Sequence, residues 1–256
     1  VTWSCADAQS GVVSATVTQT LASEGTNQSA TGTCANRAGL SASDTQTGIN
    51  IDKTAPTITF LSRLPAANGN GWNSADVTIT WSCTNSLSPI LSGTVTQTLT
   101  AEGAAQSATG MCQDQAGNTA SNTQSGINID KTAPTGVSLV PSGTLGNNGW
   151  YTSNVTITTT GTEAVSGPLT CTGVQSLTTD TASATFNGSC TNLAGFTSNA
   201  APLTLKRDAT NPTITFLNRT PANGNGWNNG DVTLNWSCTD AMSGPVDGTI
   251  TQTATA

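Results

Sequence analysis

The sequence contains no histidine, one tyrosine and three glutamates among its 256 residues. A serine or cysteine nucleophile needs a nearby general base, and histidine supplies that base most often. The chain offers no evident base, so we expect it not to be an enzyme. Zinc is also disfavoured, because histidine is lacking and no Cys-x-x-Cys spacing occurs.

Charge is scarce as well. Charged residues make up 8% of the chain, the formal net charge is −7, and the three lysines and four arginines form no cluster. Nucleic acids and anionic membranes both require grouped cations, so we expect neither as a partner. No apolar run is long enough to cross a bilayer, and we expect no membrane insertion within this sequence.

The sequence repeats itself every 78 residues. Asp52, Asp130 and Asp208 are spaced by 78 positions, and the ten residues 48–57 reappear unchanged as 126–135. A fixed long period indicates one folding unit copied in tandem. We interpret the chain as part of a longer array with four domains: a partial repeat at 1–51, complete repeats at 52–129 and 130–207, and a partial repeat at 208–256.

We expect the cysteines to form one disulfide in each repeat, with the pairs Cys5–Cys34, Cys83–Cys112 and Cys171–Cys190. Cys238 aligns with Cys83, so its partner is expected about 29 residues on, beyond the end of the sequence. In the third repeat the first cysteine stands ten positions later than the period predicts. That bridge must therefore join a different strand to the Cys190 strand. Disulfides persist in oxidising surroundings, which indicates a secreted or cell-surface protein.

Hydrophobic alternation predicts short strands and no helices. Residues 76–83 place Val77, Ile79 and Trp81 on one face and threonine or serine on the other. Further strands are expected at Thr57–Leu61, Thr94–Thr100, Ala105–Cys112 and Thr119–Ile129. A run of short strands with an inward tryptophan two residues before a bridged cysteine predicts a two-sheet sandwich of the immunoglobulin-like type. The fold class is therefore all-β.

Several motifs carry a resemblance to a known family. They are DKTAP at Asp52 and Asp130, the turns GNGWN and GNNGWY, and WSC with a later DQAGN. The chain resembles, over its whole length, the bacterial immunoglobulin-like tandem repeats of large extracellular surface proteins and adhesins. The resemblance implies sandwich domains arranged as an extended string or rod, outside the cell or on its surface. It does not fix a function, since such modules serve as stalk, spacer or ligand-binding tip.

Related surface repeats often bind Ca²⁺ at the joints between domains, so the resemblance raises calcium as a cofactor. The candidate ligands are Asp52, Asp130, Asp208 and Asp114, with Asp7 and Asp240 as further carboxylates. Calcium needs six to eight oxygens. However, Asp114 aligns with Asn36 and Asn192, and Asp7 aligns with Asn85. We therefore favour the interpretation that the aspartate at each joint caps a turn before Thr-Ala-Pro. No other cofactor is expected.

Three tryptophans stand in loops rich in glycine and asparagine: Trp72, Trp150 and Trp227. They could be exposed platforms for host or environmental glycans, or they could fold back and plug the open end of a sandwich. We favour the plug. Asn-x-Ser/Thr sequons occur at Asn27, Asn154, Asn187, Asn218 and Asn235, and glycosylation competes there with chance in a chain rich in asparagine and threonine.

The linkers between repeats are short and carry proline, as in residues 130–134, which restricts them to extended conformations. The first hypothesis for function is a non-catalytic structural protein of the bacterial exterior. It would be the stalk of an adhesin or the body of an extracellular filament. Its partners would be neighbouring repeats of the same or identical chains. The alternative is a carbohydrate-binding or calcium-stabilised adhesive module.

Overall fold

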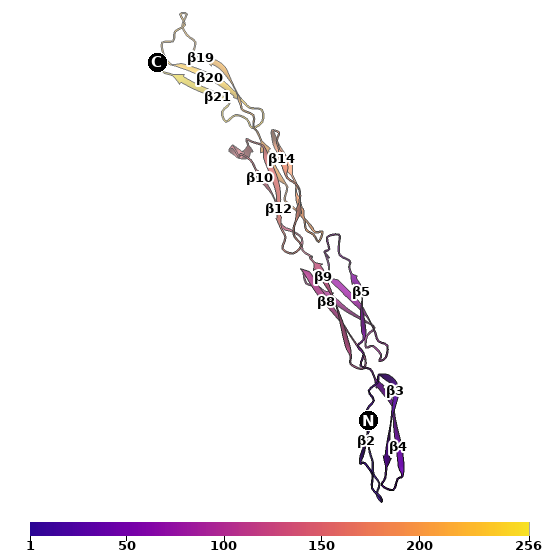
Figure 1. The fold of residues 1–256 in the computed structure, drawn as a ribbon. Helices are drawn as coiled ribbons and strands as arrows, with labels where there is room; N and C mark the ends of the chain where they lie inside the picture. The colour runs from indigo at the N-terminus through magenta and orange to yellow at the C-terminus, as the bar shows by residue number, and fades with distance from the viewer. Residues whose placement is uncertain (256) are drawn as a thin grey trace. The chain divides into compact units, whose positions relative to one another are not determined.

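The computed structural model describes residues 1–255, which form strands, turns and one short 3₁₀ helix, η1 (Asn147–Gly149), with no α-helix in that range (Figure 1). The all-β prediction is confirmed. The chain divides into two compact units. Unit 1 comprises residues 1–67 and 75–129, and unit 2 comprises residues 68–74 and the chain from residue 130 onward. For orientation we call residues 1–51, 52–129, 130–207 and 208–255 segments 1 to 4, after the period of the sequence.

The strands of unit 1 are β1 (Thr2–Ser4), β2 (Thr16–Thr18), β3 (Gly25–Ala35), β4 (Ser41–Ile51), β5 (Thr57–Leu64), β6 (Val77–Thr84), β7 (Thr94–Leu99), β8 (Gly103–Gln113) and β9 (Thr119–Ile129). The strands of unit 2 are β10 (Thr135–Ser142), β11 (Trp150–Tyr151), β12 (Val155–Thr162), β13 (Thr170–Cys171), β14 (Gln175–Leu177), β15 (Thr181–Phe186), β16 (Ser189–Thr191), β17 (Thr197–Asn199), β18 (Leu203–Arg207), β19 (Thr213–Arg219), β20 (Val232–Thr239) and β21 (Thr249–Ala254). No helix of the described residues is long and apolar enough to span a membrane.

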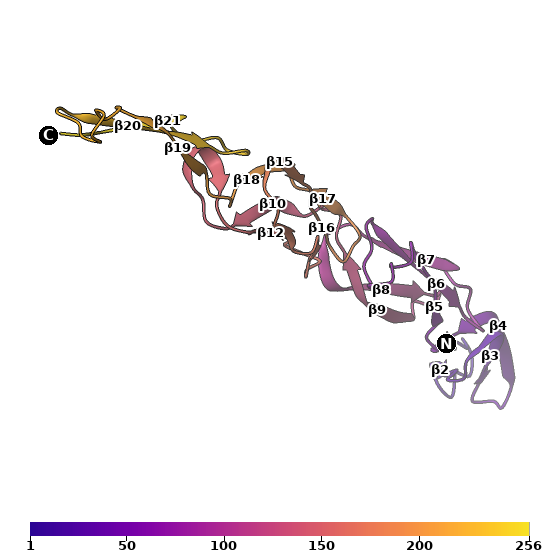
Figure 2. The same ribbon diagram turned by 90° about the horizontal axis from the view of Figure 1, so that it is seen from above.

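Unit 1 is built from antiparallel pairs. Strands β5, β6 and β7 form one sheet, β8 pairs with β9, β3 with β4, and β1 with β2. The hairpins β3–β4 and β8–β9 have the same register at positions 78 residues apart, with Cys34 opposite Ala42 and Cys112 opposite Ala120. Both views show β8 and β9 side by side (Figures 1 and 2). Segments 1 and 2 therefore use the same hairpin twice.

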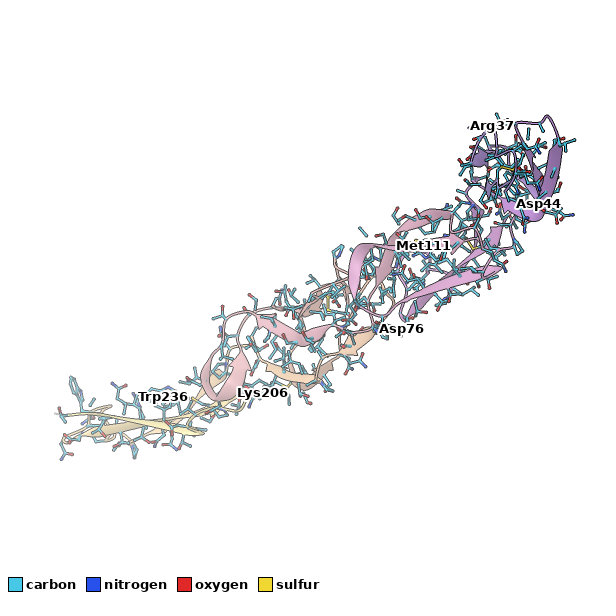
Figure 3. All side chains as sticks on the ribbon, turned by 90° about the horizontal axis from the view of Figure 1, so that it is seen from below. Arg37, Asp44, Asp76, Met111, Lys206 and Trp236 are labelled. Atoms are coloured by element: carbon cyan, nitrogen blue, oxygen red, sulfur yellow. A yellow bond between two sulfur atoms is a disulfide. The ribbon has the colours of Figure 1, made fainter. Side chains whose placement is uncertain are left out.

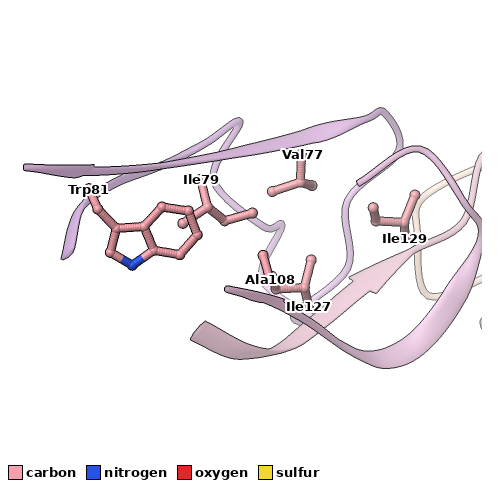
Figure 4. Packing of buried hydrophobic residues seen from close by; sticks show 6 residues of the cluster. All are labelled: Val77, Ile79, Trp81, Ala108, Ile127 and Ile129. Carbon is pink, nitrogen blue, oxygen red and sulfur yellow. The ribbon is translucent and has the colours of Figure 1, made fainter. Parts of the chain in front are cut away.

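The core of segment 2 lies between two layers. Val77, Ile79 and Trp81 point inward from β6, and each is 0% exposed. They pack against Ala108 of β8 and against Ile127 and Ile129 of β9, as Figure 4 shows. The inward face of β6 that alternation predicted is confirmed, because successive side chains of a strand point to opposite faces.

A glycine on β8 makes room for the central tryptophan. A Cβ atom at Gly110 would lie 2.5 Å from Cδ2 of Trp81, and one at Gly32 would lie 2.3 Å from Cδ2 of Trp3. No carbon atom fits at such a distance, so the strand that covers each tryptophan must carry glycine there. The next residue along β8, Met111, lies on the outer face and is 64% exposed (Figure 3). Tryptophan and glycine together set the register between the two layers.

Unit 2 contains four three-stranded sheets, with the orders β10–β12–β14, β11–β18–β15, β13–β16–β17 and β19–β20–β21. The core of segment 3 consists of Val155, Ile157, Leu177 and Leu205. Segment 4 is the single sheet β19–β20–β21, where Trp236, labelled in Figure 3, is half-buried and makes an edge-to-face contact with Phe216 at 6.3 Å between ring centroids.

Three disulfides are present, and they join the pairs expected from the sequence: Cys5–Cys34, Cys83–Cys112 and Cys171–Cys190. Cys83 lies on β6 and Cys112 on β8, so that bridge connects two sheets. Cys171 and Cys190 instead lie opposite each other on the paired strands β13 and β16 of one sheet. The predicted change of strand in segment 3 is therefore confirmed. Cys238 is half-buried and unpaired among the described residues. Disulfides indicate an oxidising compartment rather than the cytoplasm.

Candidate functional site: the joints between segments

The aspartates that open each linker have the same local conformation. One carboxylate oxygen, Oδ1, accepts the backbone N–H two residues on, at 3.0 Å in Asp52, 2.9 Å in Asp130 and 3.0 Å in Asp208. This is the Asx turn that short side-chain acceptors favour before an extended chain. The interpretation of these aspartates as turn caps is confirmed.

The second carboxylate oxygen ties the linker to the following segment. Oδ2 of Asp52 accepts the backbone N–H of Ser88 at 2.9 Å and the side-chain amide of Asn85 at 2.9 Å. Oδ2 of Asp208 accepts the backbone N–H of Ser243 at 3.0 Å. Ser243 stands at the position that Ser88 occupies two copies earlier, so the linker is anchored in the same way at both joints.

At the joint of segment 3 the anchoring aspartate is fully buried. Asp130 and Ser166 are both 0% exposed, and the Ser166 hydroxyl donates to Oδ2 of Asp130. The side-chain amide of Asn192 donates to the same oxygen at 3.0 Å. A buried carboxylate is costly unless donors satisfy it, and here two side chains do so.

The preceding segment holds the linker from its other side. The carboxylate of Glu24 accepts the backbone N–H of Lys53 at 2.6 Å and the Thr54 hydroxyl at 2.9 Å. Glu24 belongs to segment 1, and both donors belong to the linker. Hydrogen bonds to an ionised acceptor are stronger than neutral ones, so this contact fixes the linker against its predecessor.

The same contact recurs at the last joint. The carboxylate of Asp180 accepts the backbone N–H of Ala209 at 2.9 Å and the Thr210 hydroxyl at 2.7 Å. It also pairs with Arg207 at 2.5 Å, and Arg207 is only 9% exposed. The Thr210 hydroxyl, the Ala209 N–H and the Arg207 charge lower the pKa of Asp180, so it stays ionised. Asp180 stands two periods after Glu24.

The first tryptophan loop packs within unit 2. Trp72 is 8% exposed, and the side-chain amide of Asn68 donates to the backbone oxygen of Leu193 at 2.8 Å. The backbone oxygen of Asn73 accepts the N–H of Asp130 at 3.0 Å. The loop thus belongs to the joint and helps to position the linker aspartate.

The other two tryptophans differ in exposure. Trp150 is half-buried, with Nζ of Lys206 at 5.1 Å from its ring centroid, a cation–π contact. The next residue, Tyr151, accepts the N–H of Asp208 at 2.9 Å, which reproduces the contact of the first loop. Trp227 is 74% exposed. A joint role therefore explains Trp72 and Trp150, and Trp227 alone presents its ring to solvent.

The calcium candidates are distributed as follows. Asp114 is 1% exposed, and its Oδ2 accepts the amide of Asn85 at 3.0 Å, the same amide that donates to Asp52. Asp7 and Asp240 cap their own loops through backbone N–H groups. Over residues 1–255, no three side chains of the histidine, cysteine, aspartate and glutamate types gather in one place. The structure brings Asp52 and Asp114 together around an amide.

Stability should respond to pH through Asp52. The Ser88 hydroxyl and N–H, the Thr54 N–H and the Asn85 amide lower the pKa of Asp52 from its ordinary 3.8 to about 2. A lowered carboxyl pKa stabilises the fold above the unfolded value, and this contribution is lost as pH falls from about 4 to about 2. We expect Asp52→Asn to melt below the wild-type chain at neutral pH, with the gap closing near pH 2. Calorimetry of both chains across this range would measure it, and a gap independent of pH would contradict it.

Sequence reasoning missed most partners at the joints. Glu24 and Asp180 carried a usable signal, because an acidic residue recurs with the period at positions 24, 102 and 180. Asn85 and Ser88 carried none, since only the fold brings their loop to the linker.

No family model matches the chain, and no curated protein matches it. At Asp52 and Asp208, the joints supply hydrogen bonds that hold the linker from both sides.

Proposed function

We propose that this chain is a non-catalytic structural protein of the bacterial exterior. In this proposal, tandem immunoglobulin-like domains form an extended string that serves as the stalk of an adhesin or the body of an extracellular filament. One observation carries it: the linkers at Asp52 and Asp208 are hydrogen-bonded to both neighbouring segments at equivalent positions, to a carboxylate of the preceding segment and to a backbone N–H of the following one. A protein whose role is reach depends on joints that keep their geometry under load.

The composition supports the same proposal. Three disulfides suit an oxidising exterior, and each removes conformational freedom from the unfolded chain. Cross-strand hydroxyl pairs cover outward faces, for example Thr109 with Thr123 and Thr31 with Thr45, both at 2.8 Å. Such a neutral polar surface keeps strands soluble without charge. The partners of this protein would be neighbouring copies of its own domains.

Electron microscopy of the native material, with small-angle scattering of the purified chain, would test the proposal. We expect a string of domains spaced on the order of 35–45 Å, given strands of five to eight residues and their end loops. A native fibre would identify a filament, and isolated strings attached to cells would identify a stalk. A compact particle without regular spacing would refute both.

The contact from the preceding segment provides a residue-level prediction. We expect Glu24→Ala to raise the hydrogen-exchange rate of the Lys53 amide about tenfold, because one charge-assisted hydrogen bond of about 1.4 kcal/mol is lost. Asp180→Ala should do the same for the Ala209 amide. Asp247→Ala, which changes an exposed aspartate outside the linkers, serves as the control. Unchanged exchange at both linker amides would show that these carboxylates do not hold the joints.

The alternative is a carbohydrate-binding or calcium-stabilised adhesive module. Trp72 packs into a joint, which leaves Trp227 as the exposed candidate for a sugar ring. The amide of Asn85 occupies the place between Asp52 and Asp114 where a cation would stand. Melting curves in calcium chloride and then in chelator would distinguish the alternatives, since a melting temperature that rises with calcium would support the calcium-stabilised module.

A further inference from the structure

In each of the first three segments a loop that begins at Asp7, Asn85 or Glu163 faces the turn that begins at Asn36, Asp114 or Asn192. The loop and the turn are joined by a backbone hydrogen bond and by one pair of side chains at these positions. In segment 2, the amide of Asn85 donates to Oδ2 of Asp114 at 3.0 Å. One period later the roles are exchanged. The amide of Asn192, at the turn, donates to Oε2 of Glu163, in the loop, at 2.9 Å. The pair always joins one amide to one carboxylate, but its direction differs.

Segment 1 has the direction of segment 3. The amide of Asn36, at the turn, faces Oδ2 of Asp7, in the loop, at 3.4 Å. The direction of the pair is thus reversed between segments 1 and 2 and again between segments 2 and 3. When each position is compared alone between segments, the turn position is seen only to change between aspartate and asparagine, with the carboxylate lost in segments 1 and 3. Together, the two positions keep one carboxylate and one amide in every case.

The turn tolerates either residue because its own hydrogen bond uses an atom that both share. Oδ1 of Asn36, of Asp114 and of Asn192 accepts the backbone N–H four residues on, at 2.9, 2.8 and 2.9 Å. Only the second terminal atom changes, from an amide donor to a carboxylate acceptor. The loop residue must then supply the complementary group, because a buried acceptor facing another acceptor is left unsatisfied.

The hairpins that carry the turns are otherwise interchangeable between segments 1 and 2. They share length and register, and each has a glycine at the tryptophan contact and a cysteine two residues later. If the β8–β9 hairpin docked on the sheet of segment 1, Asp114 would face Asp7, and neither carboxylate would receive the amide that its native partner position supplies. Oδ2 of Asp114 would keep only the amide of Asn118, which lies on its own hairpin at 2.9 Å. The converse exchange would set Asn36 against Asn85. The disulfides would not prevent either exchange, since the cysteines also stand at equivalent positions.

We propose that the reversed direction of this pair is a pairing code that makes the hairpin of each segment fit only its own sheet. Near-identical neighbours in one chain are prone to exchange elements during folding, and a like-charge contact in the wrong pairing disfavours that exchange. Segment 3 is further distinguished by its moved disulfide. The code is therefore needed most between segments 1 and 2, and there it is present. It does not depend on the proposed function.

The test is oxidative refolding of the reduced full chain, followed by peptide mapping of its disulfides. All chains carry Cys238→Ala so that the unpaired thiol cannot exchange. Exchanged hairpins would give the bridges Cys5–Cys112 and Cys83–Cys34. We expect these bridges to increase roughly fivefold in N85D/D114N, which gives segment 2 the direction of segment 1, and likewise in D7N/N36D. The quadruple variant reverses both segments and should return to the wild-type level.

Two controls separate the code from simple destabilisation. Asn85→Asp alone leaves Asp52 and Asp114 without their shared amide, and its melting temperature should fall on the order of 5 °C. N85D/D114N should recover most of that loss, since an asparagine at position 114 supplies the donor. If the double variant melts as low as the single one, the two positions do not form a pair. If non-native bridges do not increase, or stay high in the quadruple variant, the pairing code is wrong.

Discussion

Replacing Trp81 by alanine is expected to lower the free energy of unfolding of unit 1 by about 4 kcal/mol, the cost of truncating a fully buried aromatic side chain. The indole is 0% exposed and lies between β6 and the β8–β9 hairpin (Figure 4). The cavity would be hard to refill, because the strand opposite carries Gly110 at the point of contact. The change also removes the hydrogen bond from the indole N–H to Asn122 at 3.0 Å.

Trp3→Ala is the matched control. Trp3 has the same partners by position, with Gly32 beneath its ring and an indole N–H that donates to Asp44 at 2.9 Å. It is only half-buried, however, so its truncation should cost about 1–2 kcal/mol. Urea denaturation followed by circular dichroism would measure both variants. If both variants lost the same free energy of unfolding, the degree of burial of the indole would not determine how much the tryptophan contributes to stability.

The strands of segment 2 could be predicted because their signal is local. Alternation over residues 76–83 follows from the period of two in a strand and correctly placed Val77, Ile79 and Trp81 inside. The end of β5 could not be predicted in the same way. Pairing with β6 shifts register between Phe60 and Ser62 and then continues to Leu64. An irregularity of this kind depends on the partner strand, which the alternation pattern does not contain.

The joints show a different limit. Their aspartates were predicted as turn caps, because the acceptor and the donor stand two residues apart. The donors from neighbouring segments were not, since Asn85 lies 33 residues from Asp52. Comparing positions one at a time even gave a misleading result. Asn192 stands in segment 3 where segment 2 has Asp114, so the carboxylate appeared to be lost, although Glu163 supplies a carboxylate on the other side of the same contact. Complementarity between two positions becomes visible only when the fold makes them neighbours.

Segment 3 shows how the fold adapts when its central pair is lost. Thr159 stands where the period places a tryptophan, yet glycine persists opposite it at Gly188. A Cβ atom there would lie 2.6 Å from the Thr159 hydroxyl and 2.8 Å from Cδ2 of Leu139. Leu139 therefore occupies part of the space of the missing ring. The sequence showed the loss of the tryptophan, but the residue that fills its place comes from another strand.

Removing the disulfide of segment 2 in the double variant C83A/C112A is expected to cost about 3.6 kcal/mol, from the conformational freedom returned to the unfolded chain. The bridge spans 29 residues, whereas the bridge between Cys171 and Cys190 spans 19. Because this entropy depends on the logarithm of loop length, C171A/C190A should cost nearly as much, about 3.2 kcal/mol. Cys238→Ala, which breaks no bond within the described residues, is the control and should change little.

The two disulfides nevertheless join different kinds of structural element, and this makes the comparison of the two variants decisive. Cys83 and Cys112 connect two sheets, while Cys171 and Cys190 connect neighbouring strands that backbone hydrogen bonds already join. If disulfides act here through the unfolded chain, urea denaturation should give nearly equal losses for the two variants. A loss confined to C83A/C112A would show instead that the bridge stabilises the folded contact between sheets. Near-equal losses of unfolding free energy would explain how the disulfide could move to another strand in segment 3 while its contribution to stability was retained.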